Sequence, residues 1–168
     1  MTPLLPVAEA LARVLAAARP GQEVVEVALI DALGSVLAGD VVASIAVPGD
    51  DNSAMDGYAV RAAEAAGPLQ VSQRIAAGAG EAVFLAPGTA ARIFTGAAIP
   101  PGADAVVMQE NCEEHDGVLA ISGTVTPGQN IRPRGQDIAP GSTVLARGRV
   151  LRPQDMGLLA SIGRSTVE

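Results

Sequence analysis

The sequence predicts a β-rich α+β fold in which a compact β lobe lies between helical segments near the two chain ends. Three observations indicate this. Glycine (19) and proline (12) exceed their usual share in 168 residues, which is typical of short strands joined by frequent turns. Short apolar runs bounded by turn residues recur through the middle of the chain. Apolar residues near each end recur at helical spacing instead.

The first 45 residues are expected to form one amphipathic helix and several short elements. The spacing of Val7, Leu11, Val14, Leu15 and Ala18 predicts a helix over residues 6–18, with Pro6 in its first turn. Arg19-Pro20-Gly21 should end it. A second short helix is expected over 28–33, ending at Gly34. Strand-like pairs or runs surround it at 24–27, 36–37 and 41–42.

The middle of the chain is expected to form the β lobe. The predicted strands are Tyr58–Val60, Leu69–Ile75, Ala91–Phe94, Ala105–Met108 and Val118–Ile121. Asp116-Gly117 is a hairpin signal just before the last of these strands. The regular strand spacing favours a sheet or a partly closed barrel.

The end of the chain returns to a helical pattern. Pro153 suits a first turn, Met156, Leu159 and Ala160 share one face, and Gly163 suits a C-cap. Ser165–Glu168 resembles the start of a strand. We therefore expect the chain to be interrupted at a domain boundary, with another domain to follow.

Composition excludes several classes of function. The net charge of −7 disfavours binding to nucleic acids or anionic membranes, and aromatic residues (2%) are too few to form stacking platforms for bases. The single cysteine, Cys112, excludes an intramolecular disulfide and a cysteine-based zinc cluster. No apolar run approaches the length of a membrane span. We expect a cytoplasmic protein.

The densest polar segment is 47–58, which contains Asp50, Asp51, Asn52, Ser53 and Asp56. Its small residues Ala54 and Gly57 allow a ligand to approach the backbone. A carboxylate here can coordinate magnesium or accept a hydrogen bond from a heterocyclic N–H group. The same residue types are ordinary turn formers, so both interpretations stay open.

A second polar segment begins where the predicted strand at 91–94 ends. Thr95 and Gly96 there offer a hydroxyl and unshielded backbone N–H groups, which can bind an anion. The alternative is a hairpin-like connection in which the threonine hydroxyl bonds to its own backbone.

The third polar segment, 130–138, places Arg132 and Arg134 on either side of a proline. Arginine can bind phosphate or carboxylate through two parallel hydrogen bonds. The alternative is a surface ion pair with Asp137 or another local acid. The only histidine, His115, lies beside the predicted hairpin turn and is interpreted as a solvated turn residue, and Cys112 as an inert thiol.

Four strings in one order cover most of the chain and carry a resemblance to a known family. They are DNSAMDGYAVR (51–61), IFTGAAIPPGADAVVMQE (93–110), GQNIRPRGQDI (128–138) and PQDMGLLASIG (153–163). Together they resemble the N-terminal region of the molybdopterin molybdenumtransferase family, which is related to the C-terminal part of gephyrin. The first string is the most specific.

The resemblance implies an elongated lobe built from both chain ends, residues 1–45 and 141–168, and an inserted β lobe over 46–140. It also implies a following pterin-binding domain that this chain lacks, and a homodimer. No nucleic-acid or membrane partner is implied.

The resemblance also implies functional residues. Asp56 and Thr95 fall on positions associated with catalysis. The hypothesis drawn from this match is that Asp56 holds a magnesium ion or orients attacking water, and that Thr95 with its neighbouring amides receives an oxyanion. Asn52, Ser53, Gly96, Arg132, Arg134 and Asp137 are implied to contact substrate. The expected ligands are Mg²⁺, molybdate and adenylylated molybdopterin, none of them bound tightly by this chain alone.

Two hypotheses follow. In the first, the chain contributes half of a composite active site that inserts molybdenum into molybdopterin as AMP leaves, and is inactive in isolation. In the second, it is a non-catalytic module for dimerisation or scaffolding, in which the acidic residues of the motifs only shape turns.

Overall fold

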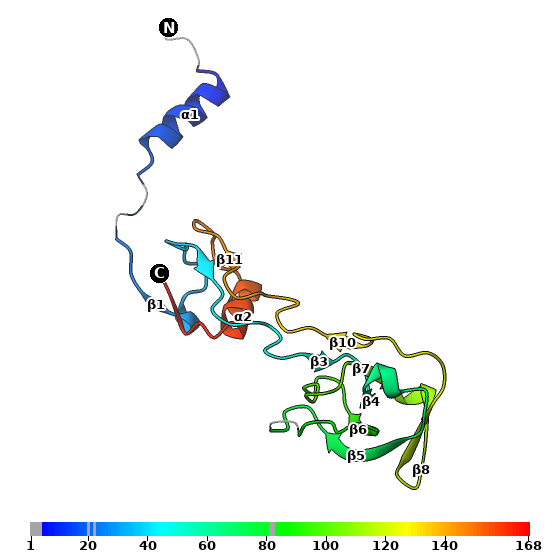
Figure 1. Ribbon diagram of the computed structural model, residues 1–168. Coiled ribbons are helices and arrows are strands. Elements are labelled where there is room, and N and C mark those ends of the chain that lie inside the picture. Colours follow the sequence, from blue (N-terminus) through cyan, green and yellow to red (C-terminus); the bar gives the residue numbers. More distant parts are fainter. Residues whose placement is uncertain (1–4, 20, 22, 81–82) are drawn as a thin grey trace.

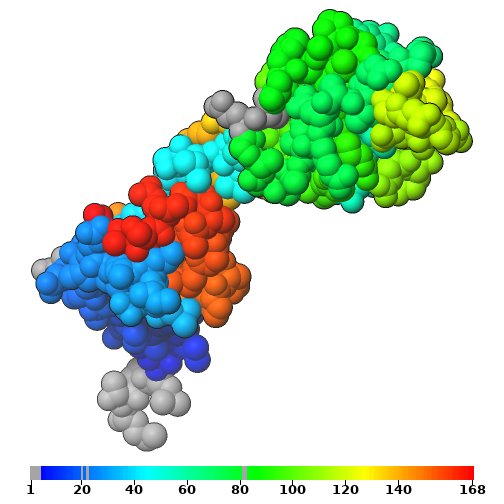
Figure 2. Space-filling model, turned by 90° about the horizontal axis from the view of Figure 1, so that it is seen from below, coloured from blue at the N-terminus to red at the C-terminus, as the bar shows by residue number. Residues whose placement is uncertain are grey.

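The computed structural model describes residues 5–19, 21, 23–80 and 83–168. Figure 1 shows an elongated molecule, with helix α1 (Val7–Ala17) at one end, a small lobe near the middle and a β lobe at the other end. Figure 2 shows the two lobes as rounded masses joined by a narrow neck. Strands predominate, and two α-helices occur in the described residues, which confirms the predicted β-rich α+β class.

Helix α1 confirms the helix predicted over 6–18. It projects away from the rest of the chain (Figure 1), and none of its residues is buried. Within it, Arg13 donates to Glu9 one turn earlier, at 2.6 Å. Neither α-helix of the described part has the length and apolar character needed to cross a membrane.

The small lobe joins the two ends of the chain through antiparallel pairs. Strand β1 (Val27–Ala28) pairs with β12 (Thr166–Val167), and β2 (Val41–Val42) pairs with β11 (Thr143–Leu145). Their shared core also receives helix α2 (Pro153–Ser161). It consists of Ala32, Leu37, Val41, Ala43, Leu145, Leu151, Leu159, Ile162 and Val167. Burial of this apolar surface holds the two ends of the chain together.

The short helix predicted over 28–33 is confirmed only in part, because this segment forms one 3₁₀ turn, η1 (Leu29–Asp31), with Gly34 after it at a φ of 83°. The reason is tertiary: the Leu29 N–H donates to the Ser165 carbonyl at 2.8 Å, and the Gly34 N–H donates to the Leu151 carbonyl at 2.9 Å. Contacts with the other end of the chain therefore fix this backbone. The strand expected at 24–27 is likewise reduced to β1, and Val36 forms only an isolated bridge.

Helix α2 matches its prediction at both ends. It begins at Pro153 and is followed by Gly163, whose φ of 76° only glycine adopts readily. At its first turn the Asp155 carboxylate accepts a hydrogen bond from the Arg152 N–H at 3.0 Å and two from the Arg149 guanidinium. The bond from the Arg152 N–H satisfies a backbone donor that the helix start leaves free.

The β lobe is a six-stranded sheet of order β7-β4-β6-β5-β9-β8. The strands are β4 (Gly57–Val60), β5 (Leu69–Ile75), β6 (Thr89–Ile93), β7 (Ala105–Met108), β8 (Cys112–His115) and β9 (Val118–Ile121). All neighbours are antiparallel except β5 and β6. The five predicted strands are confirmed, with β6 starting two residues earlier than expected, and Asp116-Gly117 turns the β8–β9 hairpin with φ of 52° and 76°.

The sheet curls until its two edges approach each other. Strands β7 and β8 lie at opposite edges but follow one another along the chain through the 3₁₀ turn η3 (Gln109–Asn111). The Tyr58 hydroxyl on β4 donates to the Glu114 carboxylate on β8 at 2.7 Å. Successive residues of β4 enter different cores, with Tyr58 in one cluster and Ala59 in the other. The lobe is therefore barrel-like, as expected.

Between the two lobes, strand β3 (Asn52–Ser53) pairs antiparallel with β10 (Ile131–Arg132). The sequence did not predict these two strands. Figure 1 shows them on the two chain segments that connect the lobes.

Candidate functional site

The three polar segments found in the sequence lie side by side in the structure. Asn52 is the register partner of Arg132 on β10 and forms an isolated bridge with Ala98 on its other side. The Ser53 N–H donates to the Ala97 carbonyl at 2.9 Å, and the Gly96 N–H donates back to the Ser53 carbonyl at 2.8 Å. Segment 51–53 is therefore the centre of a three-segment layer.

The two predicted catalytic residues, Asp56 and Thr95, are in direct contact although they are 39 positions apart in the sequence. The Thr95 backbone N–H donates to Asp56 Oδ1 at 2.8 Å, and the Thr95 hydroxyl donates to the same oxygen at 2.7 Å. Both residues are exposed. Among the described residues no hydrogen bond reaches the other carboxylate oxygen, Oδ2, which remains available to a ligand.

Sheet register explains why these two residues meet. Asp56 immediately precedes β4 and Thr95 closely follows β6, while Gly57 and Ile93 are antiparallel partners. Antiparallel pairing brings the start of one strand beside the end of the other. On the other side of β4, Gly57 allows β7 to lie close, because a Cβ there would lie 1.9 Å from the Val107 carbonyl oxygen.

Hydrogen bonding keeps the Asp56 carboxylate ionised. The two bonds from Thr95, the backbone bond being the larger contribution, lower the pKa of Asp56 below its usual value, and the charge of Arg92 adds to the effect. In this structure both Thr95 donors, the backbone N–H and the hydroxyl, are directed to Asp56. The role of Thr95 and its neighbouring amides in receiving an oxyanion stays a prediction.

The Asp56–Thr95 contact and the residues around it form a corner of the β lobe, the Asp56 corner. Arg92 belongs to it, although the sequence did not single this residue out. Its guanidinium donates to the Gly57 carbonyl at 2.8 Å and to the side chain of Gln109. It also lies over the rings of Tyr58 and Phe94, at 5.1 and 4.8 Å from their centroids. The available signal was its position three residues before Thr95, inside the predicted strand at 91–94.

The remaining predicted residues differ in how accessible they are. Ser53 is buried, and its hydroxyl donates to the Met55 carbonyl at 2.6 Å. Asn52 is half-buried within β3. Gly96 is exposed with a φ of 82°, so it forms the turn after Thr95. Ser53 thus shapes the loop around Asp56 in this structure.

The two arginines of the third segment have partners within the chain. Arg132 pairs with Asp137 at 2.7 Å, which is the surface ion pair considered as the alternative. The Arg134 N–H donates to Asp51 at 2.7 Å, and its side chain donates to the Gly49 carbonyl at 2.8 Å. Arg134 also lines an open groove of about 900 Å³ with Asp50, Asp51, Ala79, Gly80, Ala98, Ile99 and Pro101. This groove does not include Asp56 or Thr95.

A resident metal centre is not built into the described residues, which contain no group of three or more histidine, cysteine, aspartate or glutamate side chains arranged for one. Asp56 offers a single carboxylate. Magnesium commonly binds through one or two carboxylates together with substrate phosphates and water. The one carboxylate of Asp56 is within the number that this kind of site uses.

The chain is similar in sequence and in structure to members of one protein family. The family model described as the MoeA N-terminal region (domain I and II) matches residues 5–163. A crystal structure of the molybdopterin biosynthesis moeA protein from Pyrococcus horikoshii OT3 superposes with a TM-score of 0.90 at 35% identity, covering 98% of this chain and 45% of that one.

Two curated relatives agree with this match. Molybdopterin molybdenumtransferase 2 of Mycobacterium tuberculosis is 43% identical over 160 residues, covering 91% of this chain and 38% of the relative. Molybdopterin molybdenumtransferase of Haemophilus influenzae is 41% identical over 143 residues, covering 83% of this chain and 35% of the relative. The chain thus spans less than half the length of the proteins it matches.

Proposed function

Because this chain belongs to the family of MoeA N-terminal regions, we propose that it supplies half of the composite active site of a molybdopterin molybdenumtransferase. The complete enzyme inserts molybdenum from molybdate into adenylylated molybdopterin, releasing AMP while the dithiolene sulfurs bind the metal. The observation that carries this proposal is the exposed Asp56–Thr95 contact, an ionised carboxylate with one free oxygen.

The chemistry assigned to this chain is positioning and charge. Thr95 holds the Asp56 carboxylate through two hydrogen bonds, and a fixed charge that needs no rearrangement during reaction is an effective source of catalysis. Asp56 orients the reacting group of the substrate or its attacking water. A magnesium ion bound with substrate would contact Asp56 and neutralise charge on phosphate oxygens.

The proposed substrate-contacting surface consists of Asn52, Gly96, Arg132, Arg134 and Asp137. The buried Ser53 supports this surface by shaping the loop beside Asp56. Their support is proximity, since β3, β10 and segment 95–98 form one layer beside the Asp56 corner. Contact with substrate by Arg132 requires that its ion pair with Asp137 open. Such an exposed pair contributes little, about 0–1 kcal/mol, so it is no obstacle.

The remaining half of the site is assigned to a pterin-binding domain, contributed by the second subunit of a homodimer. Relatives more than twice as long as the matched region support a further domain. The proposed location is the cytoplasm, where the single thiol of Cys112 stays reduced. Burial raises the pKa of that thiol to about 11, which keeps it unreactive.

Fragment complementation tests the proposal against the alternative of a dimerisation or scaffold module. This chain is combined with the separately produced remainder of a molybdenumtransferase, and active molybdenum cofactor is measured. Restored synthesis in the mixture, with neither part active alone, is the expected result. Stable association of the two parts without restored synthesis would instead support the module.

A further inference from the structure

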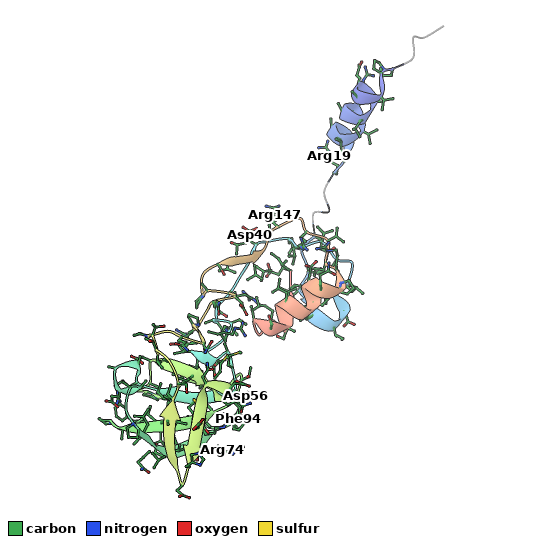
Figure 3. All side chains as sticks on the ribbon, turned by 90° about the vertical axis from the view of Figure 1, so that its right-hand side faces the viewer. Arg19, Asp40, Asp56, Arg74, Phe94 and Arg147 are labelled. Atoms are coloured by element: carbon green, nitrogen blue, oxygen red, sulfur yellow. The ribbon has the colours of Figure 1, made fainter. Side chains whose placement is uncertain are left out.

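Two arginines and an aromatic ring form a second feature beside the Asp56 corner. The Arg74 guanidinium carbon lies 4.6 Å from the centroid of Phe94, and that of Arg92 lies 4.8 Å from the same centroid. Arg74 on β5 and Arg92 on β6 are register partners, so their side chains emerge on one face of the sheet. Figure 3 shows Asp56, Phe94 and Arg74 in that order along one side of the β lobe.

The two arginines differ in how their donors are used. Arg92 is half-buried and is held by the Gly57 carbonyl and Gln109. Arg74 is exposed, and its guanidinium makes no hydrogen bond with the described residues. Neither guanidinium has a carboxylate oxygen within 4.0 Å in that part of the chain. Within the described part of the chain, the Arg74 guanidinium therefore has unused hydrogen-bond donors and lies next to the fixed positive charge of Arg92.

This arrangement is unusual for a chain whose net charge is −7. Acidic side chains outnumber basic ones, yet two like charges share one ring here, and no described carboxylate oxygen lies within 4.0 Å of either guanidinium. Their repulsion is relieved only in part by contact with the aromatic ring. An anion placed between them would gain from both charges.

An open cavity of about 360 Å³ is available to such an anion. It is lined by Val71, Ser72, Gln73, Arg74, Arg92 and Glu114. The Glu114 carboxylate opposes anion binding, but it accepts the Tyr58 hydroxyl at 2.7 Å. The cavity is therefore lined by two positively charged guanidinium groups and one carboxylate that is hydrogen-bonded to Tyr58, so its net charge is positive.

We propose that Arg74 and Arg92 bind a tetrahedral oxyanion, with Arg74 making the direct bidentate contact and Arg92 adding a fixed charge. The assignment of that oxyanion rests on the proposed function: it is either the phosphate group of an organic substrate or free molybdate. A substrate anchored there would extend across Phe94 toward the Asp56–Thr95 contact. The site would thus orient the substrate while its reacting part lies at the corner.

The test is an NMR titration of the 168-residue chain at low ionic strength. Sodium molybdate, inorganic phosphate and AMP are added separately, and the Arg74 side-chain N–H and the amides of β5 and β6 are followed. We expect saturable shifts with dissociation constants on the order of millimolar, in line with the expectation that this chain alone binds no ligand tightly. Raising the salt concentration should weaken them.

Variants make the assignment specific. Arg74→Gln should weaken oxyanion binding by about tenfold or more, because it removes the charge and the fork. Arg74→Lys should recover part of the loss, since it restores only the charge. The matched control is Arg147→Gln, another exposed arginine, on the small lobe (Figure 3), which should leave binding unchanged.

Two results would overturn the proposed site. In the first, none of the three anions shifts the amide NMR signals of β5 and β6; in the second, the Arg74→Gln variant binds the anion as tightly as the unaltered chain. In either case the ring and guanidinium groups only stabilise the sheet. Tighter binding of AMP than of molybdate identifies a phosphate ester as the ligand, and the reverse order identifies molybdate. Because this titration needs no turnover, its failure leaves the fragment complementation result standing, and failure of complementation leaves the titration standing.

Discussion

At the scale of single residues, the function of the corner depends on how Thr95 holds Asp56. Two hydrogen bonds from Thr95 to one carboxylate oxygen lower the pKa of Asp56. A carboxyl group with a lowered pKa in the folded chain stabilises the fold above its unfolded pKa and loses that contribution as the pH falls through the folded value. Asp56 is therefore charged throughout the neutral range.

Removing one of the two bonds should raise this pKa. We predict that Thr95→Ala raises the pKa of Asp56 toward its ordinary value, while the remaining backbone bond keeps part of the shift. Thr95→Ser retains the hydroxyl and should leave the pKa close to that of the unaltered chain. NMR titration of the Asp56 carboxyl carbon measures both variants. An unchanged pKa in Thr95→Ala would mean that the hydroxyl does not act on Asp56.

The residues of this corner were only partly predictable from the sequence. Asp56 and Thr95 stand in distinctive strings, so the motifs identified them. Arg74 and Arg92 were not identified, because their proximity comes from the pairing of β5 with β6 and from their shared contact with Phe94. The direction of the Thr95 donors also depends on the sheet register, which local sequence does not specify.

At the scale of secondary structure, the approach of β4 to β7 depends on a residue without a side chain. Gly57→Ala should destabilise the β lobe by about 3 kcal/mol, because its Cβ would overlap the Val107 carbonyl and force the strands apart. Chemical denaturation measures the change. Gly157→Ala in α2 is the control: it meets open space and should stabilise the chain by about 0.5–1 kcal/mol. Equal effects of the two variants would contradict this account.

The start of α2 depends on a buried carboxylate. Hydrogen bonds from Arg149, then from Arg152, lower the pKa of Asp155 from 3.8 to about 2. This contribution to stability is complete above the unfolded pKa and is lost as the pH falls toward 2. Asp155→Asn should therefore lower the Tm at pH 6, on the order of 5 °C, and the difference should shrink between pH 4 and pH 2. A difference that is constant with pH would exclude ionisation as its cause.

Local sequence predicted the elements that carry their own signals. The helices at 7–17 and 153–161 have apolar periodicity, and the β8–β9 hairpin has Asp-Gly at its turn. Strand β3 was missed because its residues, Asn52 and Ser53, are typical turn formers. Strands β10 and β11 are short and are defined by their pairing with distant segments. The same long-range contacts made the predicted helix at 28–33 a single turn.

At the scale of the whole molecule, the division into residues 1–45 with 141–168 and residues 46–140 stays a prediction. Its physical basis is the location of the cores. Both core clusters of the β lobe lie within 46–140, whereas the core of the small lobe needs both chain ends. Residues 46–140 produced alone should therefore unfold cooperatively and give a dispersed NMR spectrum. A spectrum of a disordered chain would contradict the division.

The central claim is that the Asp56–Thr95 corner belongs to the active site of a molybdenumtransferase. The most direct measurement is the rate of molybdenum insertion into adenylylated molybdopterin by the complete enzyme carrying Asp56→Asn. The amide oxygen can still accept both bonds from Thr95, so the fold should persist while the rate falls by about 10²–10³. Asp116→Asn makes the same chemical change at the β8–β9 turn and should insert molybdenum at the normal rate. A folded Asp56→Asn enzyme that works as fast as the unaltered one would contradict the claim.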